Sequence, residues 1–250
     1  MAPWAADAQV EQDLIICRAV VSLYSHEMIR ESLAFRGGTA LHKLYLQPAS
    51  RYSEDIDLVQ VGGGPAGPLM DAIQEALNPF LGTPRRAQRE ASIMLTYRAD
   101  SEIPPVQPLR LKVEVNTREH FTVEGFIDRA FRVDSRWFGG ACSIRTYTLT
   151  ELLGTKLRAL YQRRKGRDLY DLWLGLTRGG AEPGQIVRSF RTYMAAEGHR
   201  VSRSEFRSNL GAKMKRREFL GDTDSLLRLQ SEYDPGLAFA LLDERVLSLL

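Results

Sequence analysis

The hydrophobic periodicity of the chain changes near residue 149, and this change restricts the fold more than any other feature. Before it, the segment 109–116 alternates strictly, with apolar residues on one face and Arg110, Lys112 and Glu114 on the other. Such alternation is typical of a half-buried β-strand. After residue 149, apolar residues recur at helical spacing. The sequence therefore predicts an α+β domain over residues 1–148 and an all-helical domain over residues 149–250.

The same patterns predict individual elements. In the first domain we expect helices at 8–33, directly after Thr39 and at 69–80, and strands at 33–35, 55–61, 86–98, 108–116, 130–134 and 143–148. In the second domain we expect helices at 149–163, 167–178, 184–196, 203–215 and 235–249. The glycine-rich segment 62–68 is typical of a loop, and it is not a Walker-type phosphate loop because no Gly-Lys-Ser/Thr follows it.

Composition excludes several classes of protein. With 44% hydrophobic and 26% charged residues, the chain is globular rather than disordered. No apolar run approaches the roughly 18 residues of a membrane span, and the N-terminal residues show no basic segment followed by an apolar one. The two cysteines cannot form a disulfide framework, and the four histidines lack zinc-site spacing. We therefore expect no membrane partner and a cytoplasmic location.

Positive charge is concentrated in one stretch of the second domain. The chain carries a net charge of +3, but residues 151–220 alone hold 16 Lys and Arg against 7 Asp and Glu. A basic surplus with interleaved aromatic residues is typical of a surface that binds a polyanion such as RNA. Solvated helix faces explain the same charges, and most of the aromatic residues are expected in the core, so both interpretations stay open.

Residues that suit phosphate and metal chemistry gather in the first domain. Gly37, Gly38 and Thr39 lie between an expected strand and a helix, where bare backbone and free N–H groups favour a phosphate. Asp55 and Asp57 share one face of a strand, about 7 Å apart. With Glu114 from a later strand they form a carboxylate set suited to Mg²⁺.

Each part of this arrangement is weak by itself. A lone Gly-Gly-Thr is usually a turn, a lone Asp-x-Asp is common at turns, and a strand Glu is often exposed. Without a cation the carboxylates would repel one another. The order of the glycine turn, the helix, the Asp-x-Asp strand and the later strand with Glu114 is far more specific than any one of these features.

The motifs resemble those of the polymerase-β-like nucleotidyltransferases, and more closely the AbiEii/AbiGii toxin family that includes the MenT toxins. The resemblance rests on FRGGTALHKLYL, RYSEDIDLV, KLRALY from Lys156 and RDLYDL from Arg167, and it spans about residues 33–175. Fifteen residues separate Thr39 from Asp55, a longer spacing than the wider superfamily commonly has. The resemblance implies a mixed β-sheet flanked by helices, followed by an all-helical lobe.

The resemblance also implies roles for individual residues. In the first domain, the segment Gly37, Gly38 and Thr39, together with Ser53, would bind the β- and γ-phosphates of a nucleoside triphosphate. Mg²⁺ would be bound by Asp55 and Asp57. Glu114 would complete the metal site or help deprotonate the acceptor hydroxyl. In the second domain, Lys156, with Arg158 or Arg163, would contact the triphosphate, and Asp171 or Asp168 would orient these bases or the nucleotide.

Helical spacing supports part of this assignment. Lys156 and Arg163 are seven residues apart and share a helix face, as do Asp168 and Asp171. Two carboxylates on one helix face repel each other unless a cation lies nearby. Their spacing therefore favours a functional site over a solvated helix face. The spacing does not rank Asp168 against Asp171, whereas the family pattern favours Asp171.

We therefore expect a Mg²⁺-dependent nucleotidyltransferase toxin. Similar toxins transfer a nucleotide, often from CTP or another pyrimidine triphosphate, to the 3′ end of tRNA, which blocks translation, and they are encoded with an antitoxin. The alternatives are a small-molecule or protein hydroxyl as acceptor, and a non-catalytic RNA-binding regulator on the same fold. A phosphate on Ser53 would add negative charge beside the carboxylates and inhibit the enzyme; an unmodified Ser53 that stabilises the turn is the simpler interpretation.

Overall fold

A computed structural model describes residues 4, 6–227 and 232–250 of the chain. The elements of its first part are α1 (Asp7–Ser25), α2 (Glu27–Ser32), β1 (Leu33–Arg36), α3 (Gly37–Leu44), β2 (Asp55–Gln60), α4 (Gly67–Leu81), β3 (Arg85–Gln88), β4 (Ser92–Asp100), β5 (Pro108–Asn116), β6 (Phe126–Asp134) and β7 (Gly139–Tyr147). The second part has α5 (Leu149–Gln162), α6 (Gly166–Thr177), α7 (Pro183–Ala196), α8 (Arg203–Met214), α9 (Arg217–Leu220) and α10 (Pro235–Arg245), with short 3₁₀ turns at Gly221–Thr223 and Leu247–Leu249.

The chain divides into two compact units, which we call the sheet unit and the helical unit. The sheet unit comprises residues 1–122 and 126–147, and the helical unit comprises residues 123–125 and 148–250. The short segment 123–125 belongs to the helical unit because the carboxylate of Glu151 on α5 accepts the backbone N–H groups of Val123 (2.8 Å) and Glu124 (2.9 Å). Tyr193 on α7 donates its hydroxyl to the same carboxylate at 2.8 Å.

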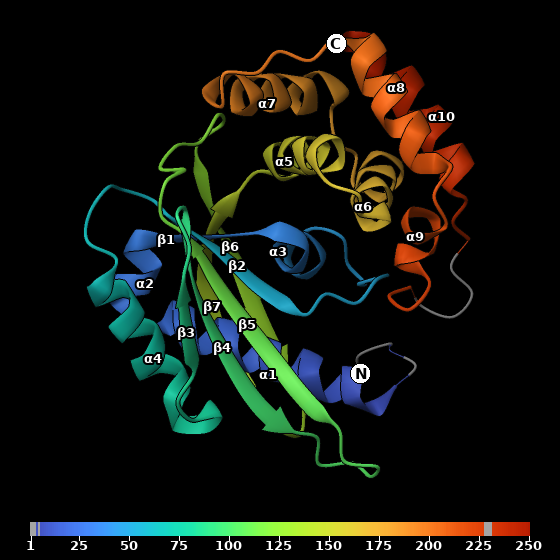
Figure 1. Ribbon diagram of the computed structural model, residues 1–250. Helices are drawn as coiled ribbons and strands as arrows, with labels where there is room; N and C mark the ends of the chain where they lie inside the picture. Colours follow the sequence, from blue (N-terminus) through green and yellow to red (C-terminus); the bar gives the residue numbers. More distant parts are fainter. Residues whose placement is uncertain (1–3, 5, 228–231) are drawn as a thin grey trace. The chain divides into compact units, whose positions relative to one another are not determined.

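The sheet unit contains one mixed sheet of seven strands in the order β3-β4-β5-β2-β1-β7-β6. The pairs β2–β5 and β1–β7 are parallel, and the remaining pairs are antiparallel. The predicted α+β class, with a mixed sheet followed by a helical part, is confirmed. Helices α1, α2 and α4 lie on one side of this sheet, and α3 lies on the other (Figure 1).

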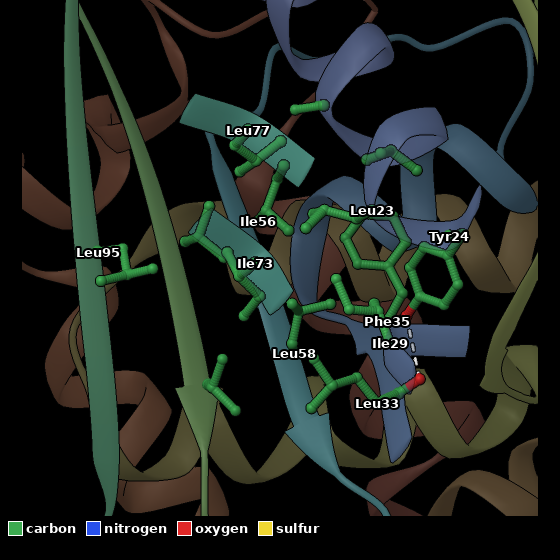
Figure 2. Close-up of a cluster of buried hydrophobic side chains, with 14 of the residues drawn as sticks. Leu23, Tyr24, Ile29, Leu33, Phe35, Ile56, Leu58, Ile73, Leu77 and Leu95 are labelled. Carbon is green, nitrogen blue, oxygen red and sulfur yellow. Dashed lines mark hydrogen bonds between the residues drawn. The ribbon is translucent and has the colours of Figure 1, made fainter. Parts of the chain in front are cut away.

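The core of the sheet unit lies on the side of α1, α2 and α4. Alternate residues of the strands, such as Phe35 and Leu58, point toward these helices and are essentially inaccessible to solvent. Figure 2 shows them packed against Leu23 and Ile73, with the Tyr24 hydroxyl donating to the carbonyl of Leu33 at 3.3 Å. Since one strand face is used for the core, the side chains between these residues project from the other face.

Two predicted elements are wrong in detail. The helix expected over 8–33 is interrupted at His26, whose backbone is extended (φ −84°, ψ 124°), so α1 and α2 are separate helices. The strand expected over 86–98 is a hairpin of β3 and β4, closed by the N–H of Arg89 donating to the carbonyl of Ser92 at 2.8 Å. All four residues of β3 are exposed, as befits an edge strand protected by charged residues such as Arg85 and Arg86.

The helical unit shows well-defined helix starts. Thr148 caps α5 by accepting the N–H of Glu151, and Ser202 forms a reciprocal capping box with Glu205 at the start of α8. Most aromatic residues of the basic stretch are core residues, as expected: Tyr170, Phe190, Tyr193 and Phe206 are buried. Within residues 4, 6–227 and 232–250, no helix combines the length and the apolar character that crossing a membrane requires.

Candidate functional site

The strand register places the acidic residues of the sheet unit on one face. Asp57 on β2 pairs with Glu114 on β5 and with Arg36 on β1, and Asp55 pairs with Lys112 on β5. Paired residues on neighbouring strands project to the same side, with the strands about 4.8 Å apart. Asp55, Asp57, Lys112 and Glu114 therefore share the face opposite the core, and we call them the sheet cluster.

Lys112 links two of the carboxylates. Its Nζ lies 3.2 Å from Oδ2 of Asp55 and 3.1 Å from Oε2 of Glu114. The other oxygen of Glu114, Oε1, accepts the hydroxyl of Ser92 at 2.8 Å. Burial opposes the charge of Lys112, but Asp55 and Glu114 raise the pKa of Lys112. Burial likewise opposes ionisation of Glu114, but hydrogen bonds from Ser92 and Lys112 lower the pKa of Glu114, so its carboxylate is ionised at neutral pH.

The sheet cluster suits a hard divalent cation by the chemistry of its donors. Carboxylate oxygens are the ligands that Mg²⁺ takes from proteins, and the ammonium of Lys112 already lies where positive charge is needed. Among the described residues, no three His, Cys, Asp or Glu side chains converge in a ready metal-binding arrangement. Two of the three carboxylates, Asp55 and Glu114, are thus linked by a lysine.

The start of α3 packs directly onto this cluster. Gly37 has φ +81°, and a Cβ at this position would lie 2.2 Å from Oδ2 of Asp57. A Cβ on Gly38 would lie 2.5 Å from Nη2 of Arg51, which is 2% exposed. The two glycines let the helix start approach these side chains, and the N–H groups of a first helical turn have no acceptor within the helix. The arrangement brings the first turn of α3 beside Asp57 of β2.

Thr39 and Ser53 fasten α3 to the start of β2. The Thr39 hydroxyl donates to the backbone carbonyl of Asp55 and lies 2.9 Å from the Ser53 hydroxyl. Thr39 is 1% exposed. Its side chain therefore positions the turn, and the backbone N–H groups are the donors available to a phosphate.

The sequence analysis missed two residues of this region. Lys112 is predicted on the same strand face as Glu114 but without a role, and its ion pairs with Asp55 and Glu114 are seen only in the structure. Arg51 begins the motif RYSEDIDLV but is given no role by it, and in the structure it is buried and donates from Nη1 to the carbonyl of Tyr52 at 2.8 Å.

The helical unit contains a second charged cluster, formed by α5, α6 and the loop between them, which we call the helical cluster. Nζ of Lys156 lies 3.2 Å from Oδ1 of Asp168 and 2.9 Å from Oδ2 of Asp171. Arg163 donates to both oxygens of Asp168, at 2.7 Å and 2.8 Å. Both aspartates are fully buried. Burial opposes ionisation of Asp168, but Lys156 and Arg163 lower the pKa of Asp168, so the repulsion between the two aspartates is relieved within the unit.

Arg158 lies outside this helical cluster. Its Nη1 lies 3.0 Å from Oε1 of Glu197, and its guanidinium lies 4.9 Å from the centre of the Tyr193 ring. Two residues along a helix point in nearly opposite directions, so Arg158 contacts α7 and its C-terminal end, whereas Lys156 contacts α6.

Comparison with known protein families gives a match over most of the chain. The family model described as nucleotidyl transferase AbiEii toxin, type IV toxin–antitoxin system, matches residues 18–241. The chain belongs to the AbiEii nucleotidyltransferase toxin family. A comparison with curated proteins gives no significant match.

Two solved structures share its fold. MenT4, a nucleotidyltransferase toxin from Mycobacterium tuberculosis, aligns with a TM-score of 0.60 at 17% identity, over 96% of this chain and 82% of that one. JHP933 from Helicobacter pylori aligns with a TM-score of 0.58 at 14% identity, over 97% and 93% of the two chains. Family membership makes this AbiEii protein a nucleotidyltransferase of a toxin–antitoxin system, with a nucleotide as substrate and an antitoxin as partner.

Proposed function

We propose that this AbiEii protein transfers a nucleoside monophosphate from a nucleoside triphosphate to an RNA acceptor, the 3′ end of tRNA, and that it requires Mg²⁺. The observation that carries the proposal is the shared face of Asp55, Asp57 and Glu114 beside the first turn of α3. Modification of the tRNA 3′ end prevents aminoacylation and would arrest translation in the cytoplasm.

Each proposed site residue of the sheet unit has a separate role in the transfer reaction. In the reaction the acceptor hydroxyl forms a bond to the α-phosphorus, the bond from this phosphorus to the bridging oxygen breaks, and pyrophosphate leaves. Mg²⁺ held by Asp55 and Asp57 would offset charge on the phosphates and make the acceptor hydroxyl more acidic. The N–H groups of Gly37, Gly38 and Thr39 bind the β- and γ-phosphates at the start of α3. The ionised Glu114 serves as a third metal ligand or accepts the hydroxyl proton.

The roles inferred for the helical unit rest on the resemblance. Lys156, supported by Arg163, is proposed to bind the triphosphate, and Asp171 or Asp168 to orient these bases. The buried contacts of Lys156 with both aspartates support a fixed position for its ammonium. The contacts of Arg158 with Glu197 and Tyr193 favour Lys156 and Arg163 over Arg158 for this task.

Exposed positive charge in the helical unit supports an RNA acceptor. Arg164, Lys215, Arg216 and Arg217 are exposed and have no ion-pair partner among the residues that the structure describes. Lys213, in the same basic stretch, is buried and donates to the carbonyl oxygens of Leu160 and Tyr161 at the end of α5, so we do not count it among the residues that contact RNA phosphates.

The direct test is a transfer assay with each radiolabelled triphosphate, Mg²⁺ and total tRNA, with Asp57→Asn as the inactive control. We expect label on tRNA, with a pyrimidine triphosphate as the best donor. Label on the protein itself, or on a small molecule supplied with it, would show that the acceptor is a protein or small-molecule hydroxyl rather than tRNA. A protein that binds tRNA but labels nothing under any condition would be an RNA-binding regulator.

A second test measures tRNA affinity against salt for two triple-Gln variants. One changes Arg163, Arg164 and Lys165, and the other changes Lys215, Arg216 and Arg217. Each lost phosphate contact should lower the slope of log K against log salt by about 0.7–0.9. Unchanged binding in both variants would contradict the RNA acceptor.

A further inference from the structure

We propose that Lys112 is an internal counter-ion of the carboxylates in the sheet cluster, which must be displaced before a divalent cation can bind them. The inference rests on the metal site proposed above, and concerns a residue to which neither the sequence motifs nor the family match gives a role. Lys112 is a positioning residue, because it acts through Asp55 and Glu114.

The first observation is the position of the ammonium. Lys112 lies directly across from Asp55 in the β2–β5 pairing and two residues before Glu114 on the same strand face. Its Nζ lies 3.2 Å from one carboxylate and 3.1 Å from the other. A single positive charge thus bridges an oxygen from each of two strands, which is the task of a bound metal in such a site.

The second observation concerns the oxygens that remain. Glu114 uses Oε1 for the Ser92 hydroxyl, so its Oε2 is the oxygen that contacts Lys112. On Asp55 the contact is made by Oδ2. A cation that uses these two oxygens therefore replaces both ion pairs of Lys112.

The third observation is exposure. The side chains of Lys112, Glu114 and Asp55 are 22%, 26% and 37% exposed. Water reaches these groups, so the ammonium can leave and become hydrated. Displacement of a partly exposed lysine is feasible because water can replace its ion pairs, whereas a fully buried ammonium would be left without a compensating partner.

Two consequences follow from this geometry. Without metal, Lys112 offsets repulsion between the carboxylates and keeps their side chains on the site face. With metal, its two ion pairs are lost, so the affinity of the site for the cation is lower than the carboxylates alone would provide. The toxin would then depend on the concentration of free divalent cation.

The test measures Mn²⁺ binding to the full chain without nucleotide, using Lys112→Met and the matched control Arg110→Met. Arg110 lies on the same strand and the same face, is exposed, and carries the same charge. We expect Lys112→Met to lower the dissociation constant of Mn²⁺ on the order of tenfold, or about 1.4 kcal/mol. Arg110→Met should change it less than about threefold, because a hydrated charge about 7 Å further along the strand is strongly screened.

Thermal unfolding in EDTA and in Mg²⁺ supplies a readout independent of turnover. Lys112→Met should unfold at a lower temperature than wild type in EDTA, and Mg²⁺ should raise its unfolding temperature more than that of wild type. Equal dissociation constants in Lys112→Met and Arg110→Met would overturn the inference. Weaker triphosphate binding with unchanged Mn²⁺ binding would also overturn it, since Lys112 would then be a phosphate ligand.

A measurement on the wild type keeps the inference testable if Lys112→Met does not fold. The chain has six lysines, so the ¹⁵N signal of the Lys112 ammonium can be assigned from its absence in Lys112→Arg. The signal should be visible without metal, while the ion pairs protect its protons, and should vanish as Mg²⁺ is added. A signal that persists through the titration would contradict displacement.

Asp55→Asn separates this inference from the metal site itself. If wild type and Asp55→Asn bind Mn²⁺ equally, the proposed metal site fails, and the role of Lys112 fails with it. If Asp55→Asn binds Mn²⁺ more weakly while Lys112→Met behaves like Arg110→Met, the metal site stands and only the counter-ion role is lost.

Discussion

Replacing Gly37 by Ala should separate the catalytic geometry of the site from the stability of the fold. Gly37 has φ +81°, a conformation that costs an L-residue about 1–2 kcal/mol. The added Cβ would also lie 2.2 Å from Oδ2 of Asp57, where ordinary contacts begin at 3.4 Å. The carboxylate must therefore move by about 1 Å, a displacement that can cost on the order of 100-fold in rate.

Gly82→Ala is the matched control. Gly82 follows α4 with φ +72°, and a Cβ there would meet nothing within 4 Å. Both variants should lose about 1–2 kcal/mol of unfolding free energy, which corresponds to roughly 2–8 °C for a chain of this size. Only Gly37→Ala should lose nucleotide transfer, by about 100-fold in kcat/KM. Transfer within threefold of wild type in Gly37→Ala, or an equal loss in Gly82→Ala, would refute the reasoning.

Four further substitutions probe single residues in or beside the two clusters. Asp55→Asn and Asp57→Asn should each abolish transfer and relieve toxicity while the far-ultraviolet circular dichroism stays that of wild type; near-normal transfer in Mg²⁺ by either would contradict the metal site. Ser53→Asp should reduce transfer by placing negative charge beside the carboxylates, and a fully active variant would argue against control through this residue. Asp168→Asn should lower the unfolding free energy by about 3 kcal/mol at pH 7, because it removes a buried partner of two cations. Because folding lowers the pKa of Asp168, its contribution is present at neutral pH and is lost as the pH falls below about 4, so urea unfolding from pH 7 to pH 3 should show a smaller acid-induced loss in the variant.

The elements with strong periodicity were predictable, and those that depend on tertiary contacts were not. The alternation of 109–116 predicts both faces of β5, because a half-buried strand must separate apolar from polar residues. The break at His26 had no such signal, since histidine is only slightly unfavourable in a helix. The β3–β4 turn contains no Gly or Pro at Arg89–Ala91, so nothing in the local sequence indicated a hairpin.

The candidate site was predictable only as a set of carboxylates and glycines. Spacing placed Asp55 and Asp57 on one strand face, and the register of β2 with β5 adds Glu114 to that face. The partner of these carboxylates was not predictable, because a lysine on the polar face of a strand is most often solvated. Only the pairing of Asp55 with Lys112 across two strands distant in sequence reveals the ion pairs.

Each unit contains a lysine that forms ion pairs with two carboxylates, and the exposure of the lysine decides whether a metal ion can displace it. Lys112 is 22% exposed and can be hydrated when its partners bind a metal, whereas Lys156 is 8% exposed beside two fully buried aspartates. Removing Lys156 leaves Asp171 without that partner in a buried site, where the loss of one charge of a pair costs about 3–5 kcal/mol. Mg²⁺ should therefore restore the unfolding temperature of Lys112→Met but not that of Lys156→Met, because a hydrated dication must shed water to reach the buried pair. If Mg²⁺ restored the unfolding temperature of both variants equally, burial would not determine whether a metal ion can replace the lysine. The argument that exposure lets Mg²⁺ displace Lys112 would then fail.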